Sequence, residues 1–194
     1  MNPDKPARVG SRLWRIPKHR WLLGIPIGAI FTFIVGVGFT GGFLGGLKYF
    51  ETETFCTTCH EMQTPLQQLR QSVHGSNAYG IRATCSDCHV PPEFLPGVLR
   101  HIEASMEVWG HLIGKIDTPA KFERHKLEMA RAVWRELKAN DSAECRRCHS
   151  YAAMALDKQG PIAAKRHSTD YLAKTGKTCI DCHKGVAHTL PQGM

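Results

Sequence analysis

The distribution of hydrophobic residues divides the chain into one long uncharged segment and a more polar part that follows it. No charged residue lies between Trp21 and Leu47. A helix of that length is roughly 40 Å long, whereas the hydrocarbon layer of a membrane is about 30 Å thick. The segment ends in a glycine-rich stretch at 41–46 with no Ala-x-Ala-like cleavage site, which favours a retained anchor over a signal peptide. The pattern therefore predicts a transmembrane helix over residues 21–47.

Glycines recur inside this predicted helix at Gly38, Gly42 and Gly46. Small residues four positions apart share one helix face and allow a second membrane helix to approach closely. A homo-oligomer formed through this face is therefore a hypothesis. The alternative is that glycine is simply frequent in membrane helices.

Two further segments carry apolar residues at helical spacing. The first has Leu99, Ile102, Met106, Trp109 and Ile113, and the second has Phe122, Met129, Val133 and Leu137. The second is expected to begin at Thr118-Pro119, a capping residue followed by a first-turn proline, and to end near Asn140. Both stripes favour packing against a neighbouring helix or a bound cofactor. No alternating strand pattern appears, so the fold is expected to be mainly α.

The cysteines indicate a bound cofactor, because all eight belong to four Cys-x-x-Cys-His motifs. The motifs are Cys56–His60, Cys85–His89, Cys145–His149 and Cys179–His183. Two thiols at this spacing can add to the vinyl groups of a haem, and the adjacent histidine can then reach the iron. The sequence therefore predicts four covalently attached c-type haems, bonded through Cys56, Cys59, Cys85, Cys88, Cys145, Cys148, Cys179 and Cys182. The four motif histidines, His60, His89, His149 and His183, are expected to be axial ligands.

Zinc sites, disulfides and thioredoxin-like motifs also use paired cysteines but fit this sequence less well. A zinc ribbon uses Cys-x-x-Cys pairs but gives no reason for a histidine after every second cysteine. Cysteines at this spacing are usually redox-active or metal-binding rather than structural disulfides. Thioredoxin-like chemistry requires one motif beside a βαβ pattern, which this sequence lacks.

The length of the chain limits what can surround these haems. The chain has 194 residues, so the part after the anchor is too short to enclose four macrocycles and also build an ordinary core. We therefore expect a small helical and irregular domain over residues 48–194 that is packed on its haems and folds only when they are attached. Its two dihaem halves are expected at about 51–95 and 141–190.

Charge indicates the orientation of the chain in the membrane. Six cations and one acid precede the predicted anchor, so most of the formal net charge of +8 belongs to this tail. A basic tail over residues 1–20 is expected to remain in the cytoplasm. The haem domain would then be periplasmic, on the outer side of a bacterial inner membrane, where c-type haem is attached. The remaining cations can neutralise haem propionates, so we expect no nucleic-acid partner.

An internal repeat identifies candidates for the other axial position of each haem. Thr84–His89 matches Thr178–His183, and a lone histidine precedes each copy, at His74 and at His167. His188 follows the last motif in a short loop. These three histidines are candidate distal ligands. His101, His111 and His125 lie in predicted helices and are expected to be solvated or bonded to propionates, whereas Met62 is a thioether candidate near the first haem.

The chain resembles the NapC/NirT family of membrane-anchored tetrahaem cytochromes along essentially its whole length. The resemblance rests on the segments Phe55–Met62, Val73-His74, Arg82–Pro91, Ile116–Pro119 and Thr178–Gly185. It implies a quinol dehydrogenase that draws on the membrane quinol pool and passes electrons to a periplasmic reductase, nitrate reductase being the usual partner of NapC members.

The resemblance also implies roles for individual residues. It places the quinol site at the first haem, with Met62 rather than His60 on the iron in relatives that share Cys-His-x-Met; both remain candidates here. It pairs His188, His74 and His167 with the second, third and fourth haems. It makes Arg100 and Glu107 the quinol-site residues, with Glu107 accepting a proton. Arg100 stands where several relatives have lysine, and Pro92 where some have histidine.

A second class of function is a multihaem terminal reductase that reduces a small oxyanion itself at an open haem. Such an enzyme needs a substrate pocket lined with donors, and the sequence leaves no segment to build one. A relay that oxidises quinol is therefore the preferred interpretation.

Overall fold

The computed structural model describes residues 21–22 and 25–194, with side chains from Pro26 onward. The expected basic tail over 1–20 lies outside the described residues. The chain divides into two units between Gly46 and Leu47, and the second is Leu47–Met194. In the first unit, β1 (Trp21–Leu22) pairs antiparallel with β2 (Ile25–Pro26). The long helix α1 (Ile27–Phe50) follows directly.

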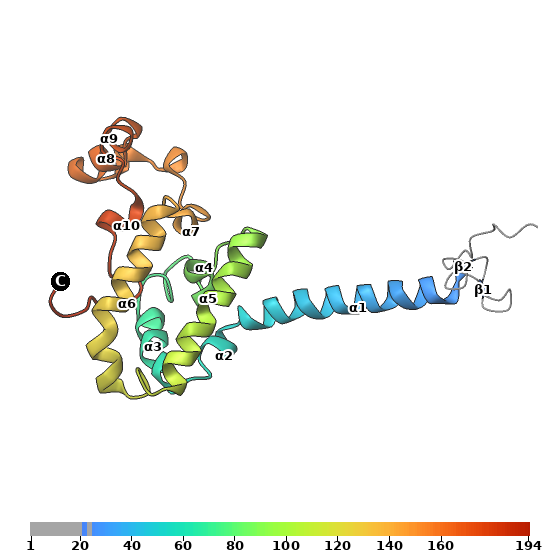
Figure 1. Ribbon diagram of the computed structural model, residues 1–194. Helices are drawn as coiled ribbons and strands as arrows, with labels where there is room; N and C mark the ends of the chain where they lie inside the picture. The colour runs from blue at the N-terminus through green and yellow to red at the C-terminus, as the bar shows by residue number, and fades with distance from the viewer. Residues whose placement is uncertain (1–20, 23–24) are drawn as a thin grey trace, which may run out of the picture. The chain divides into compact units, whose positions relative to one another are not determined.

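Helix α1 is long and apolar enough to cross a membrane, and none of its residues is buried (Figure 1). It begins at Ile27 rather than at the expected Trp21, and it continues three residues beyond Leu47. Pro26 explains the start, because the residue before a proline is driven out of the helical region of backbone space. A Cβ added at Gly38, Gly42 or Gly46 would have no atom within 4 Å, so no other segment described in the structure packs on these glycines. Pairing with a second membrane helix through this face stays a prediction.

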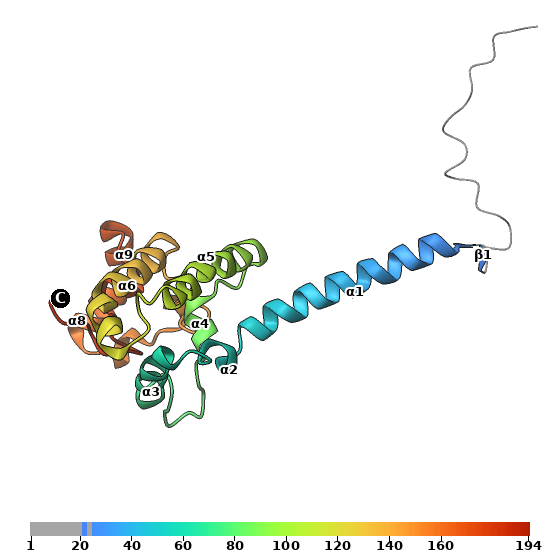
Figure 2. The same ribbon diagram turned by 60° about the horizontal axis from the view of Figure 1, so that its bottom comes forward.

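The second unit is built from short helices around two longer ones. The elements are α2 (Glu53–Cys56), η3 (His60–Met62), α3 (Gln63–Gln71), α4 (Cys85–His89), α5 (Phe94–Leu112), α6 (Pro119–Ala139), α7 (Ala143–Arg146), η4 (Tyr151–Ala153), η5 (Leu156–Lys158), α8 (Pro161–His167), α9 (Thr169–Thr175) and α10 (Cys179–Cys182). Helices α5 and α6 are the two long helices of this unit, and a short connection over 113–118 joins them (Figure 1, Figure 2). The mainly α fold predicted from the sequence is confirmed.

Both amphipathic helices predicted from the sequence are present. Thr118 caps α6 by accepting a hydrogen bond from the Lys121 amide at 3.3 Å, and Pro119 occupies the first turn. A proline is tolerated there because its missing N–H would have no partner inside the helix. Helix α6 ends at Ala139, with Asn140 as its C-cap.

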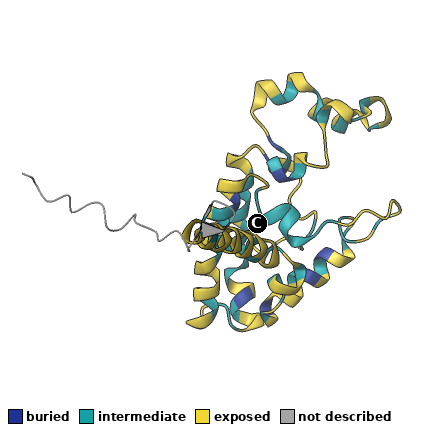
Figure 3. Cartoon of the chain, turned by 90° about the vertical axis from the view of Figure 1, so that its right-hand side faces the viewer, coloured by how far each residue is buried: buried dark blue, intermediate teal, exposed yellow. Residues whose placement is uncertain are grey.

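The polypeptide of the second unit encloses very little apolar surface of its own. Among the described residues, the buried apolar side chains are Leu66, Leu69, Phe122 and Ile180. Figure 3 shows buried positions only as short isolated patches. The stripe on α5 stays open, with Ile102 61% and Met106 67% exposed. A domain of this size normally buries a continuous core, so these side chains are arranged around volume that the protein itself does not fill.

The two expected halves of the haem domain are linked rather than separate. Helix α4 from the first half packs beside α7 from the second, and α10 packs on α6. Ser142, which is fully buried, accepts a hydrogen bond from the Ile180 amide at 3.2 Å. Contacts of this kind explain why residues Leu47–Met194 form one compact unit.

Candidate haem site

Each Cys-x-x-Cys-His motif includes or adjoins a single turn of helix. Helix α2 ends at Cys56, α4 and α10 begin at Cys85 and Cys179, and α7 contains Cys145. Residues three apart in a helical turn lie on the same side. Helices α4 and α10 contain both cysteines of their motifs and so present the two thiols in one direction. All eight cysteines are free of disulfides, as thioether attachment requires.

Capping residues explain the Thr-Cys-x-Asp-Cys-His repeat. The Asp87 carboxylate accepts hydrogen bonds from the Thr84 amide at 2.8 Å and from the Thr84 hydroxyl at 2.7 Å. The Asp181 carboxylate accepts from the Thr178 amide at 2.7 Å in the same way. These bonds satisfy donors that a helix start leaves unpaired. The repeat therefore holds the second and fourth motifs in helical form.

Replacing Asp87 by alanine should weaken this helix start. We expect Asp87→Ala to lower the free energy of unfolding by about 1 kcal/mol, the usual cost of a lost cap. The Thr84 hydroxyl and amide hold the pKa of Asp87 below its ordinary value. The carboxylate therefore contributes stability above about pH 4, and that contribution is lost as the pH falls further.

Thermal unfolding of the haem-loaded protein, measured at neutral pH and at pH 3, checks this prediction. Asp170→Ala is the matched control, because Asp170 also lies in the first turn of a short helix, α9. Its effect should stay within about 0.5 kcal/mol. Equal effects of the two variants at neutral pH would contradict the capping role.

The four motifs follow one another in space in their sequence order. Contact with the Cys85 thiol, followed by burial, raises the pKa of Cys56, so these two sulfurs are neighbours. Burial raises the pKa of Cys145 to about 11, with further contributions from Cys179 and Cys88. The Tyr151 hydroxyl lies 3.3 Å from the Cys179 sulfur. Groups attached at these cysteines would form a chain from the first motif to the fourth.

Each motif histidine faces one other histidine ring in the described part of the chain. The ring centres are 6.3 Å apart for His89 and His188, 6.1 Å for His149 and His74, and 5.9 Å for His183 and His167. His60 faces His111 at 6.0 Å. The sequence predicts the first three partners as ligands but does not predict His111.

These separations suit two imidazoles on opposite faces of one haem. A metal–nitrogen bond is about 2 Å long and the ring centre lies about 1 Å further out, so the two centres should be about 6 Å apart. Burial, followed by His188 and Arg100, lowers the pKa of His89 to about 4. Its ring is therefore neutral at neutral pH, which is the form that binds a metal. The residues present fit the haems that the motifs imply.

Several facing rings are also oriented through their Nδ1 atoms. The Nδ1 atom of His74 lies 3.3 Å from the Val186 carbonyl oxygen, and that of His167 lies 2.7 Å from the Gln159 side-chain oxygen. An Nδ1–H that donates to oxygen fixes the tautomer and leaves Nε2 free for iron. Gly75 helps to place His74, because a Cβ there would lie 2.1 Å from the Leu69 carbonyl oxygen.

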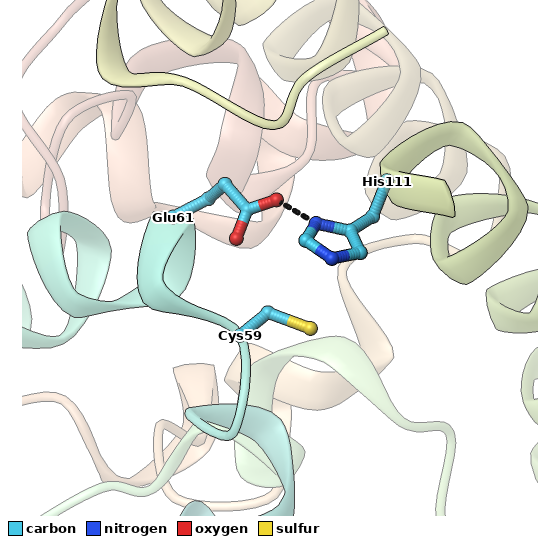
Figure 4. A group of neighbouring side chains, drawn as sticks. All are labelled: Cys59, Glu61 and His111. Atoms are coloured by element: carbon cyan, nitrogen blue, oxygen red, sulfur yellow. Dashed lines mark hydrogen bonds and ion pairs between the residues drawn. The ribbon is translucent and has the colours of Figure 1, made fainter. Parts of the chain in front are cut away.

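Near the first motif, Cys59, Glu61 and His111 converge, with ligand atoms within 4.8 Å of one another (Figure 4). Glu61 is only 4% exposed, and one of its carboxylate oxygens is hydrogen-bonded to His111 Nδ1. Burial acts to raise the pKa of Glu61, but backbone bonds and His111 outweigh it, so the pKa lies below its ordinary value. Met62 is 37% exposed. No periodic signal in the sequence marks this cluster, since Glu61 and His111 are fifty positions apart.

The two residues expected at the quinol site lie together on α5. Arg100 donates a hydrogen bond to Glu107 at 2.6 Å, and the Arg100 side chain is 17% exposed whereas that of Glu107 is 63% exposed. Arg100 also lines a cavity of about 240 Å³ between α5 and α6 that Cys88 and His89 reach. Arg100 therefore lies beside the second motif, whereas Glu107 is near Cys56 of the first motif and, after the Cys85 thiol and burial, contributes to raising the pKa of that thiol.

A second cavity, of about 470 Å³, lies along α6 and α10 and is strongly basic. Its cations are Arg131, Arg135, Lys138 and Lys184. The Lys184 ammonium stands over the Trp134 ring at 4.6 Å, and Lys138 is paired with Asp181. Cations gathered beside the fourth motif attract anionic groups, haem propionates among them.

Comparison with known proteins agrees with this site. The model of the NapC/NirT cytochrome c family, N-terminal region, matches residues 19–193. The cytochrome c-type protein NapC of Escherichia coli K12 is 46% identical over 191 residues, covering 98% of this chain and 94% of the relative. NapC of Paracoccus pantotrophus is 48% identical over 92% of this chain and 76% of the relative. The denitrification system component NirT of Stutzerimonas stutzeri is 45% identical over 94% of this chain and 89% of the relative. No solved structure matches the chain.

Proposed function

Because the chain belongs to the NapC/NirT cytochrome c family, we propose that it is a membrane-anchored tetrahaem cytochrome that oxidises quinol and passes electrons to a periplasmic reductase. The observation that carries this proposal is the pairing of every motif histidine with a second histidine at 5.9 to 6.3 Å. Imidazoles on both faces of an iron favour electron transfer over ligand chemistry. Four haem sites that follow one another in sequence order would make a relay.

In this proposal the eight motif cysteines bond four haems. The second, third and fourth irons would be held by three histidine pairs, His89 with His188, His149 with His74, and His183 with His167. Two of these pairs join the first half of the domain to the second, so haem attachment and folding depend on each other. The first iron is bound by His60 or Met62.

Quinol oxidation releases two electrons and two protons, and haems held at these motifs would supply one-electron acceptors for it. In this proposal Glu107 takes one proton. Its carboxylate is exposed and accepts a hydrogen bond from Arg100 at 2.6 Å, which supports the role. The second proton leaves to water. Arg100 is a positioning residue that orients this carboxylate, which lies near enough to Cys56 of the first motif to add to the effect of Cys85 and burial in raising the pKa of that thiol.

The proposal also includes the orientation of the protein in the membrane and the reductase that receives its electrons. Helix α1 anchors the protein in the inner membrane beside the quinol pool, with the N-terminus in the cytoplasm and residues 48–194 in the periplasm. The similarity to NapC supports nitrate reductase as the first partner to test. The identity to NirT, 45%, is close to that with NapC, so other reductases of denitrification are further candidate partners.

Anaerobic reduction by a quinol tests the proposal. The purified full-length protein in detergent should contain four haems per chain and become reduced when a soluble quinol analogue is added. It should not consume nitrate or nitrite on its own. Consumption of either anion without a partner would favour the terminal reductase, and haems that stay oxidised with every quinol would refute the relay.

A further inference from the structure

We propose that His111 is the second axial ligand of the first haem, opposite His60, so that this iron carries two imidazoles and no open position. The inference rests on the proposed function, since it requires a haem bonded to Cys56 and Cys59. It assigns a ligand role to a residue expected from the sequence to be solvated or bonded to a propionate.

The first argument is the geometry of the two rings. The centres of His60 and His111 are 6.0 Å apart, inside the range of 5.9 to 6.3 Å found for the other three motif histidines. The angle between the two ring planes is 71°, and the other pairs range from 18° to 80°. The first motif therefore repeats the arrangement of the other three.

The second argument is the contact that orients His111. Its Nδ1 atom faces a buried Glu61 carboxylate, and in Figure 4 the two groups point toward each other. An Nδ1–H that donates to this carboxylate leaves Nε2 as the atom available to a metal. His74 and His167 show the same pattern with a carbonyl and an amide oxygen. A carboxylate partner makes imidazole a stronger ligand than either of these does.

The third argument is the position of His111 relative to the first motif. Cys59, which would bond the haem, has its sulfur within 4.8 Å of the Glu61 and His111 ligand atoms. His125 on α6 is half-buried like His111 and pairs with Glu128 at 3.0 Å, but it has no facing histidine among the described residues. An oriented second ring beside the attachment site distinguishes His111 from an ordinary helical histidine.

The proposal changes how electrons enter the protein. With His60 and His111 both bound to the first iron, no position on that iron would be left for quinol. Glu107 and His111 are four residues apart on α5, so they share one helix face. The proton acceptor thus lies one turn from a ligand of the electron acceptor. The electron and the proton released by quinol would therefore be taken up one helical turn apart, at the haem held by His111 and at Glu107.

Spin state measures the ligand directly and does not depend on turnover. In the full-length holoprotein, electron paramagnetic resonance should show four low-spin haems. His111→Ala should turn one of the four high-spin without changing the haem count, and added imidazole should restore the low-spin signal. His125→Ala is the matched control and should leave all four signals unchanged. Met62→Leu should also leave them unchanged.

Two results would overturn the assignment: four low-spin haems in His111→Ala, or loss of one low-spin signal in Met62→Leu. If His111→Ala does not assemble, His111→Met retains a metal-binding side chain and should show one haem with mixed histidine and methionine ligation. The haem count and quinol reduction of the unmodified protein are measured first. If the unmodified protein lacks four haems or is not reduced by quinol, the proposed function is wrong. If it is reduced by quinol but the His111→Ala spectrum is unchanged, only the assignment of His111 as a ligand is wrong.

Discussion

A chain carrying Cys145→Ser and Cys148→Ser is expected to lose the folded state of its haem domain, and not merely one haem. We expect a loss of more than about 4 kcal/mol, the range reached when a core is voided or a bound metal is removed. Limited proteolysis should then cut residues 48–194 at many sites, whereas the unmodified domain should resist. Haem content should fall below three per chain.

The reason is that the polypeptide has almost no core without its haems. Its buried apolar side chains in the described residues are Leu66, Leu69, Phe122 and Ile180. The third site is also central: burial, with Cys179 and Cys88 nearby, raises the pKa of Cys145, and His149 faces His74 from the other half. Removing this haem removes the surface on which both halves pack.

Tyr151→Phe is the matched control for the double cysteine variant. It deletes the hydroxyl 3.3 Å from the Cys179 sulfur but leaves every thiol in place, so four haems and protease resistance should be retained. A double cysteine variant that keeps three haems and stays resistant to protease would show that the protein part folds without the third haem.

Glu107→Gln is expected to reduce quinol oxidation by roughly 10²-fold or more, the usual contribution of a positioned proton acceptor. Glutamine keeps the size of the side chain and can still accept a hydrogen bond from Arg100, but it cannot take a proton at neutral pH. Haem content and reduction by dithionite should be unchanged. Stopped-flow reduction of the haems by a quinol analogue measures the effect.

Glu123→Gln serves as the control, because Glu123 is an exposed acid on α6 that pairs with Lys126 at 3.2 Å. Its quinol oxidation rate should match that of the unmodified protein. If Glu107→Gln also turns over normally, Glu107 takes no part in the proton transfer. If both variants are equally slow, general loss of surface charge is the cause.

The short-range features of this fold can be predicted from the sequence because they depend on neighbouring residues. The uncharged segment predicts the long helix, and Thr118-Pro119 predicts the start of α6. The predicted membrane helix begins six residues too early, since hydropathy does not report the effect of Pro26 on the backbone before it. The Thr-Cys-x-Asp-Cys-His repeat is visible as a pattern, but its capping role becomes visible only in the structure.

The residues of the candidate site also fall into those that local sequence predicts and those that it does not. The attachment cysteines are a local motif, so their chemistry can be predicted from spacing alone. His74 and His167 are found through the repeat, and the structure brings them to His149 and His183. His111 carries no such signal: it lies in an amphipathic helix, where a histidine is ordinary, and its relation to His60 depends on how α5 meets the first motif.

The anchor, the helical class and the four haem attachment motifs are specified locally along the chain, because each depends on residues within a few turns of one another. Which histidines face each other, and the burial of Glu61 against His111, are properties of the folded domain. Those relations join segments far apart in the sequence. They are set by packing around a shared volume, which no local pattern specifies.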